Sequence, residues 1–397
     1  PGGAEHDHRP GDLLIMLYLH GLGHFHPENV IDNRFLEELD IGTSDDWILE
    51  RVGIRERRTS LDLSYIRETR NKDLRAAAEA SRYTNAQAGA AAAKQALAQT
   101  GIAPADVGLV ISGSSAPDHV TPSEAATVAA ELGIEAPCFD INAACATFGV
   151  QLTYLDRMKP EALPPFILLV NPENLTRCID YSDRNTAVLF GDGSAAAVVS
   201  ATEPAPLRLT SVDCDSQPAS WQKAVIPRAG YFQQDGSAVQ GFAIRKMTEE
   251  IRRFHDFRKG CSIFPSAGGC RPLGPGKEGI VRMANCVTGA ERVSGSAPEM
   301  AVGATERTPR LGVNGHRLLF IGHQANLSVL NTVCERSAIP DDCHWRNVVM
   351  YGNTGCSGAP AVMSQRRKEL RPRDVLIMAL VGAGLTWATL VWQVGES

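Results

Sequence analysis

The chain has 397 residues, of which 44% are hydrophobic and 21% are charged, a balance typical of a globular protein with a large core. Its formal net charge of −6 argues against a general nucleic-acid-binding protein. The 10 cysteines are scattered without a CxxC pair, which indicates reduced thiols in a cytoplasmic protein.

Two apolar stretches need testing as membrane segments. Leu13 to Leu22 is too short to span a bilayer and no basic region precedes it. Val375 to Trp392 is uncharged and long enough, but Gly382 and Gly384 interrupt it, so we interpret it as two buried strands around a tight turn. We therefore expect no membrane association, and we expect residues 1–12, which are polar, to be a disordered leader.

In chain order, β and α patterns alternate. Strands are expected at Leu14 to Leu19, Val107 to Ser112, Cys138 to Ile141, Phe166 to Val170, Leu318 to Ile321 and Val348 to Tyr351. Helices are expected at about Thr43 to Gly53, Asn85 to Thr100, Pro122 to Leu132, Ile244 to Phe254, Leu327 to Arg336 and Ala359 to Leu370. Thr186 to Val199 is interpreted as a hairpin, because no helix follows its Gly-Asp-Gly as a phosphate loop would require. The alternation predicts an α/β layered fold whose second half begins near Leu207.

One segment does not fit this alternation. From about residue 256 to 313 the chain loses hydrophobic periodicity and is rich in Gly, Pro, Ser and Arg. A loop this long inside a compact domain is either functional or disordered, and its composition favours disorder. Its cysteines lack the spacing of zinc ligands, so we expect no metal site.

Cys145 is a candidate nucleophile. It follows an expected strand and lies among small residues, where a substrate carbonyl can approach the sulfur. Apolar residues recur at helical spacing after it, so we expect the thiol in the first turn of a helix, whose positive end favours the thiolate. For a lone cysteine an inert buried thiol is the plainer interpretation, and two further segments shift the balance.

Those segments are Ile321 to Asn326, which contains His323, and Tyr351 to Gly355, which contains Asn353. Both candidates directly follow expected strands, and ligand sites in α/β sheets form at the carboxyl ends of strands. A thiolate can take an acyl group from a thioester, while His and Asn can hydrogen-bond a second carbonyl oxygen and stabilise an enolate. Papain-like proteases also use Cys, His and Asn in this order, but their cysteine lies beside a tryptophan near the mature N-terminus.

With these residues the sequence resembles the β-ketoacyl-acyl-carrier-protein synthase III family of the thiolase superfamily, along nearly the whole chain except about 256–313. The matching motifs, in family order, are Thr43 to Ile48, Gly53 to Arg58, Phe190 to Gly193, His323 to Leu327, Tyr351 to Thr354 and Gly384 to Trp387. The resemblance implies a homodimer with a thiolase-like five-layer α-β-α-β-α fold of two similar halves. These halves would be residues 13–205, with the nucleophile, and 206–397, with the His/Asn pair and the irregular insertion.

The resemblance also implies catalytic roles. Cys145 matches the acylated nucleophile, and His323 and Asn353 match the pair that drives decarboxylation of a malonyl thioester. The backbone N–H groups of Cys145 and Ala383 match the oxyanion hole. Ala383 replaces the middle glycine of the usual segment, which keeps the N–H but adds a methyl group.

Substrate-binding roles follow in the same way. Trp47, Arg51 and Arg184 match the residues that line the tunnel for a coenzyme A or phosphopantetheine arm, where arginine would hold phosphate. Asn326 is also expected to bind substrate. Thr121 aligns with a loop that reaches across the dimer into the partner's acyl pocket, where it would leave room for chains longer than acetyl, although a helix cap suits this threonine equally well.

We therefore expect an acyltransferase that condenses an acyl thioester with a malonyl-type thioester, in fatty-acid initiation or polyketide-type biosynthesis. Its substrates would be acyl-CoA or acyl-carrier protein, without a cofactor. Ser328 stands where many family members have an arginine that helps to bind coenzyme A or the carrier protein. The absence of this arginine puts the mode of carrier recognition in question. One rival is an acyltransferase on the same fold that passes the acyl group to an alcohol or amine, which would not need Asn353. The other is a non-catalytic partner subunit of a condensing heterodimer, which would lack Cys145.

Overall fold

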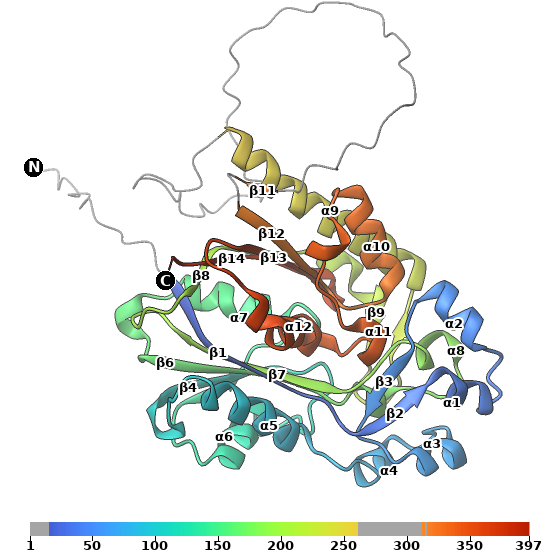
Figure 1. Cartoon of the computed structure of the whole chain (residues 1–397). Helices are drawn as coiled ribbons and strands as arrows, with labels where there is room; N and C mark the ends of the chain where they lie inside the picture. Colours follow the sequence, from blue (N-terminus) through green and yellow to red (C-terminus); the bar gives the residue numbers. More distant parts are fainter. Residues whose placement is uncertain (1–15, 261–311, 314–315, 397) are drawn as a thin grey trace, which may run out of the picture.

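The computed structural model describes residues 16–260, 312–313 and 316–396. The expected leader and most of the irregular stretch lie outside these residues. Ten strands form one sheet (Figure 1), in the order β11 (Gly312–Val313), β12 (His316–Gly322), β13 (Val375–Gly382), β14 (Thr386–Val394), β8 (Leu207–Ser216), β1 (Leu17–Phe25), β7 (Gly193–Ser200), β6 (Phe166–Glu173), β4 (Val107–Ser112), β5 (Cys138–Asp140). Two ribbons add β2 (Asn29–Asp32) with β3 (Glu56–Thr59), and β9 (Ala224–Val225) with β10 (Gln233–Gln234).

The sheet consists of two similar five-stranded halves. They meet where Leu17–Leu19 of β1 pair antiparallel with Leu207–Leu209 of β8. In the first half β4 runs parallel to β5 and β6, while β6, β7 and β1 are antiparallel. In the second half β12 and β13 are parallel, and β13, β14 and β8 are antiparallel. The edges of the two halves differ: in the second half β11 pairs antiparallel with β12, and the counterpart of β5 is only a parallel bridge between Phe320 and His344.

Helices complete the layers (Figure 1). The six main helices are α5 (Asn85–Ala98) and α6 (Glu124–Leu132) on the outer face of the first half, α9 (Gly236–Gly260) and α10 (Leu327–Arg336) on that of the second, and α7 (Thr147–Asp156) and α12 (Gly358–Arg366) between the halves. In the central layer Phe148 and Val362 share one core with Leu169 and Leu319 from the two half-sheets. The shorter helices are α1 (Asn33–Glu38), α2 (Asp45–Arg51), α3 (Leu63–Thr69), α4 (Leu74–Glu79), α8 (Arg184–Ala187) and α11 (Val348–Tyr351). This is the expected five-layer α-β-α-β-α fold.

Side-chain caps fix several helix starts. Ser44 accepts a hydrogen bond from the Trp47 N–H at the start of α2. At the start of α6, Ser123 accepts from the backbone of Ala126, so the helix begins two residues after the expected proline. The cap is therefore Ser123, and the alternative interpretation of Thr121 as a helix cap is wrong.

Three other expectations about secondary structure are wrong. Residues 348–351 form the helix α11 and not a strand. Four consecutive apolar residues show no periodicity, so the sequence cannot distinguish one helical turn from a short strand. The expected hairpin at 186–199 does not form, since β7 pairs with β1 and β6, and residues 184–187 are the helix α8. Helix α9 continues to Gly260, beyond the expected start of the irregular stretch.

The apolar stretch near the C-terminus is two antiparallel strands, β13 and β14, as expected. Within the described ranges, no helix combines the length and apolar character needed to cross a membrane.

Candidate active site

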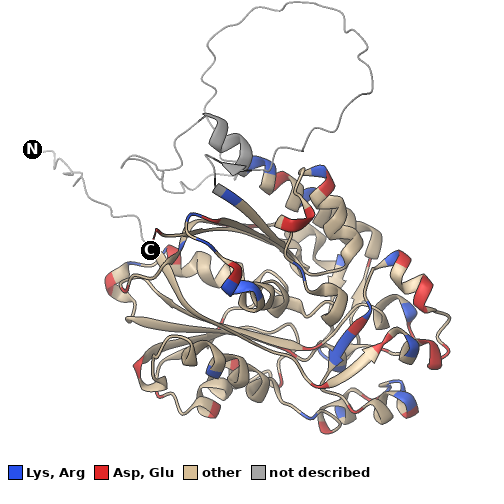
Figure 2. Ribbon diagram, viewed as in Figure 1, with Lys and Arg blue, Asp and Glu red and all other residues tan. Residues whose placement is uncertain are grey.

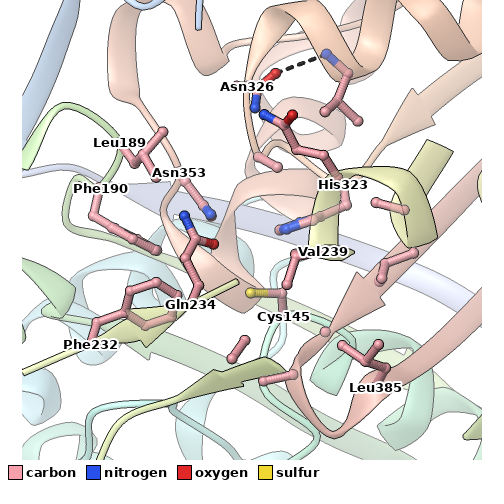
Figure 3. A pocket seen from close by; sticks show the side chains of 18 residues that line it. Cys145, Leu189, Phe190, Phe232, Gln234, Val239, His323, Asn326, Asn353 and Leu385 are labelled. Atoms are coloured by element: carbon pink, nitrogen blue, oxygen red, sulfur yellow. Dashed lines mark hydrogen bonds between the residues drawn. The ribbon is translucent and has the colours of Figure 1, made fainter. Parts of the chain in front are cut away.

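A pocket opens between the two halves of the sheet, and it contains all three candidate catalytic residues (Figure 3). Its apolar walls include Leu189, Phe190, Phe232, Val239, Val329 and Leu385. Its polar side chains are Cys145, Gln234, Gln240, His323, Asn326 and Asn353. An apolar cavity with a few convergent polar groups is the usual form of a small-molecule site.

The nucleophile turn holds Cys145 two residues before the first residue of α7. Ala144 takes a left-handed conformation (φ 48°), which turns the chain sharply before the cysteine. The Thr147 hydroxyl accepts a hydrogen bond from the Ala143 N–H at 2.9 Å and donates one to the Ala144 carbonyl at 2.6 Å. These contacts fix the backbone on both sides of the thiol.

The resting Cys145 is a thiol. Burial, together with the nearby charge of Glu173, raises the pKa of Cys145 to about 12. A helix end contributes about 0.3–1 kcal/mol, which is less than one pKa unit and cannot offset this burial. The expected position of Cys145 in the first turn of the helix is wrong, because α7 begins only at Thr147. Since burial favours the thiol over the thiolate, a base must take the proton.

His323 and Asn353 are held by their backbones. His323 follows β12, its N–H donates to the Ala379 carbonyl at 2.8 Å, and burial lowers its pKa to about 4, so the imidazole is neutral at pH 7. The Asn353 N–H donates to the Leu189 carbonyl at 2.8 Å, and its side-chain Oδ1 accepts from the Gly355 N–H at 3.0 Å. Its Nδ2 is thereby oriented as a donor.

Figure 3 shows the Cys145 sulfur, the His323 imidazole and the Asn353 amide around the same space. The three residues come from different elements: the turn before α7, the end of β12 and the loop after α11. The sequence therefore identified three residues that the fold brings together. Asn353 reaches the site after a helix and not, as expected, after a strand.

Two further expected residues also line the pocket. Ala383 lies in the turn between β13 and β14, and the neighbouring Gly382 packs against the backbone of Cys145. The Asn326 Oδ1 caps α10 by accepting from the Val329 N–H at 2.8 Å. Part of the Asn326 amide is thus committed to holding the helix that borders the site.

The other expected substrate-binding residues lie elsewhere. The guanidinium carbons of Arg51 and Arg184 stand 5.1 Å and 5.0 Å from the centroid of the Trp47 ring, so the three form one cluster, but none of them lines the pocket. Figure 2 shows basic residues on α2, β3 and α8 at the same end of the molecule. Thr121 is exposed and also lies outside the pocket lining.

The sequence did not single out three polar residues of this region, which are Glu173, Gln234 and the exposed Gln240. Glu173 ends β6 as a buried carboxylate that accepts hydrogen bonds from the backbone N–H groups of Ser115 (3.0 Å) and Cys356 (3.2 Å), and from the Ser114 hydroxyl (3.1 Å). Gln234 enters the pocket from β10, in a segment without a recognisable motif.

No group of three or more His, Cys, Asp or Glu side chains that could hold a metal ion occurs among the residues the structure describes.

Two models of one family match the chain. The model of 3-oxoacyl-[acyl-carrier-protein (ACP)] synthase III matches residues 139–218, which include Cys145, and its C-terminal model matches residues 317–394, which include His323 and Asn353. The β-ketoacyl-[acyl-carrier-protein] synthase III of Syntrophomonas wolfei is 29% identical over 396 residues, covering 95% of this chain and 97% of that protein. The same enzyme of Aquifex aeolicus is 28% identical over 379 residues, covering 94% and 97%.

Solved structures agree with these matches. The crystal structure of 3-oxoacyl-[acyl-carrier-protein] synthase III from Aquifex aeolicus has a TM-score of 0.71 at 25% identity, covering 95% of this chain and 99% of that one. The structure from Pseudomonas aeruginosa has a TM-score of 0.70, also at 25% identity, covering 96% and 98%. In both family models and in these relatives, the chain is similar to the β-ketoacyl-acyl-carrier-protein synthase III family.

Proposed function

We propose that this condensing enzyme joins an acyl thioester to a malonyl-type thioester through an acyl group on Cys145. The observation that carries the proposal is the meeting of a thiol, a neutral imidazole and an oriented amide donor in one largely apolar pocket. A neutral histidine suits this chemistry, because it can accept the Cys145 proton and later donate a hydrogen bond.

In the first half-reaction the Cys145 sulfur attacks the acyl thioester carbonyl, and the imidazole of His323 takes its proton and passes it to the departing thiolate. The backbone N–H groups of Cys145 and Ala383 would stabilise the oxyanion. Their proximity is supported by Gly382, whose added Cβ would lie 3.0 Å from the Cys145 nitrogen.

In the second half-reaction the malonyl carboxylate leaves as carbon dioxide, and the electron pair of the broken bond forms an enolate. Hydrogen bonds from His323 and from the Asn353 Nδ2 stabilise the enolate oxygen. The enolate carbon attacks the acyl carbonyl, the Cys145 thiolate departs and takes a proton from solvent, and a β-ketoacyl thioester leaves.

The substrates proposed are acyl-CoA and acyl-carrier protein, in fatty-acid initiation or a polyketide-type pathway, without a cofactor. The relatives are named as acyl-carrier-protein synthases, and the cluster of Trp47, Arg51 and Arg184 supplies cations for a phosphate. Cytoplasmic location is proposed because Cys138 and Cys178 are free thiols.

A homodimer is proposed from the edge of the sheet. β5 is the outermost strand of the first half, Phe139 on it is 43% exposed, and Val120 in the loop before α6 is 74% exposed. An exposed strand edge with apolar side chains is a natural site for a second copy. Thr121, beside Val120, would then reach into the partner's acyl pocket.

The test is a reaction of the full chain with acetyl-CoA and malonyl thioesters, followed by intact-mass and product spectra. Wild type should gain one acetyl group and release a β-ketoacyl thioester, and Cys145→Ala should gain none. Cys356→Ser is the matched control, because this thiol is also buried nearby but lies outside the pocket lining. Acylation followed only by transfer to an added alcohol or amine would support the acyltransferase, and absence of acylation a non-catalytic subunit.

A further inference from the structure

Gln234 is a pocket residue whose backbone is firmly held. It pairs with Ala224 in the ribbon of β9 and β10, and the next residue, Asp235, forms an ion pair with Lys223 at 2.7 Å. The Asp235 carboxylate also accepts from the Ala238 N–H at 3.1 Å at the start of α9. Because side chains alternate along a strand, Gln233 is exposed while Gln234 is half-buried and faces the pocket.

The Gln234 amide has no hydrogen-bond partner among the described residues, whereas both pocket asparagines are partly committed. The other pocket glutamine, Gln240, is exposed, so Gln234 is the half-buried one. Asn353 uses its Oδ1 on Gly355, and Asn326 uses its Oδ1 on Val329. Gln234 therefore offers both a donor and an acceptor to whatever occupies the pocket. A ligand that removes water from this amide without replacing its hydrogen bonds binds poorly.

The position of Gln234 identifies the part of the substrate it meets. Figure 3 shows its amide on the side of the Cys145 sulfur opposite Leu385, which belongs to the turn that also holds Ala383. If the acyl oxygen lies at the Ala383 N–H, the rest of the acyl group extends toward Gln234. Beyond it stand Phe190 and Phe232, whose ring centroids are 4.6 Å apart.

We infer that Gln234 is a specificity-determining residue that selects acyl groups carrying a hydrogen-bonding substituent, such as a hydroxyl, near the thioester carbonyl. The inference rests on the proposed function, since it assumes acyl transfer to Cys145. A plain alkyl chain would leave the Gln234 amide unpaired within apolar walls, whereas a hydroxyl would pair with it. A site built for such a hydrogen bond discriminates against the apolar analogue.

The experiment compares self-acylation by 3-hydroxybutanoyl-CoA and 3-methylbutanoyl-CoA, which differ by a hydroxyl in place of a methyl group of similar size. Rates are measured by intact mass on wild type, Gln234→Met and Gln233→Met. Wild type and Gln233→Met should react about tenfold faster with the hydroxylated group. In Gln234→Met, whose side chain has similar length but no hydrogen-bonding amide, that preference should vanish or reverse.

The outcomes are separable by including acetyl-CoA. If Cys145 is acetylated but wild type reacts equally fast with the two matched acyl-CoAs, the role of Gln234 alone is overturned. The same holds if Gln234→Met keeps the wild-type preference. Failure of every acyl-CoA to label Cys145 would overturn the proposed function and this inference with it. The wild-type comparison stands even if the methionine variant folds poorly.

Discussion

The backbone of Gly382 lies directly against that of Cys145. A Cβ on Gly382 would lie 3.0 Å from the Cys145 nitrogen and 2.6 Å from the Ala143 carbonyl oxygen, distances that require the backbone to move. We expect Gly382→Ala to displace the nucleophile and to slow self-acylation by about 10²-fold, the scale of a 1 Å misplacement. Intact-mass kinetics with acetyl-CoA measure this effect.

The matched control is Ala383→Gly, which keeps the backbone N–H and removes only a methyl group. It should acylate within about threefold of wild type, since no transition-state donor is lost. Equal acylation rates in Gly382→Ala and wild type would contradict the proposed packing of the oxyanion hole.

The reactivity of Cys145 toward an alkylating agent should follow its raised pKa. Because burial raises that pKa to about 12, the thiolate fraction increases about tenfold for each pH unit between pH 7 and 10. Iodoacetamide labelling of Cys145, with Cys145→Ala as the blank, should therefore rise throughout this range. A plateau below pH 9 would show that the resting site already stabilises a thiolate.

Three histidines with lowered pKa values should make the fold sensitive to mild acid. Burial lowers the pKa of His26 to about 3 and those of His323 and His344 to about 4, whereas in the unfolded chain they titrate near 6.5. Below pH 6.5 the unfolded state binds protons that the folded state does not. The free energy of unfolding is therefore full above pH 6.5 and decreases as the pH falls toward 4. Each histidine contributes up to about 1.4 kcal/mol per pH unit.

Urea unfolding at pH 8.0, 6.0 and 5.0 measures this loss of unfolding free energy. His344→Gln should flatten the pH dependence by the share of this one histidine, up to about 1.4 kcal/mol per pH unit. Substitution of the half-buried His20 by Gln serves as the control. A wild-type unfolding free energy that is constant from pH 8 to 5 would disagree with neutral buried imidazoles.

Thr121 should set acyl-chain length if it reaches the partner's pocket. A threonine leaves space for additional methylenes, each worth about 0.8 kcal/mol when buried. Wild type is therefore expected to accept chains longer than acetyl, and Thr121→Phe to shift preference toward short ones. A self-acylation series from acetyl to dodecanoyl-CoA tests this, and an identical profile for both proteins would exclude Thr121 from the pocket.

The sequence predicted the layers and the catalytic trio well, because both depend on local signals. A clear hydrophobic period or a capping residue marks each of three features: the two strands around Gly384, the helix from Leu327 to Arg336 and the strand before His323. Cys145, His323 and Asn353 were found through residue type and motif, without knowledge of their distances.

What the sequence could not give depends on tertiary packing. The segment before Asn353 forms a helical turn, and Asn353 is joined to Phe190, far away in the sequence, by a parallel bridge. The protonation of Cys145 follows from burial and from Glu173, which is far away in the sequence. Gln234 lies beside Cys145 through the ribbon β9–β10, and nothing in its own neighbourhood marks it.

The central claim is that Asn353 acts on the malonyl thioester and not on the acyl transfer to Cys145. The direct measurement is carbon dioxide released from carboxyl-labelled malonyl thioester by enzyme already acylated on Cys145, compared between wild type and Asn353→Ala. Asn347→Ala is the control, since this asparagine is also buried but lies outside the pocket lining. The account predicts full acylation of Asn353→Ala with carbon dioxide release about 10²–10³-fold slower than in wild type. Release by the acylated Asn353→Ala enzyme at the wild-type rate would contradict it.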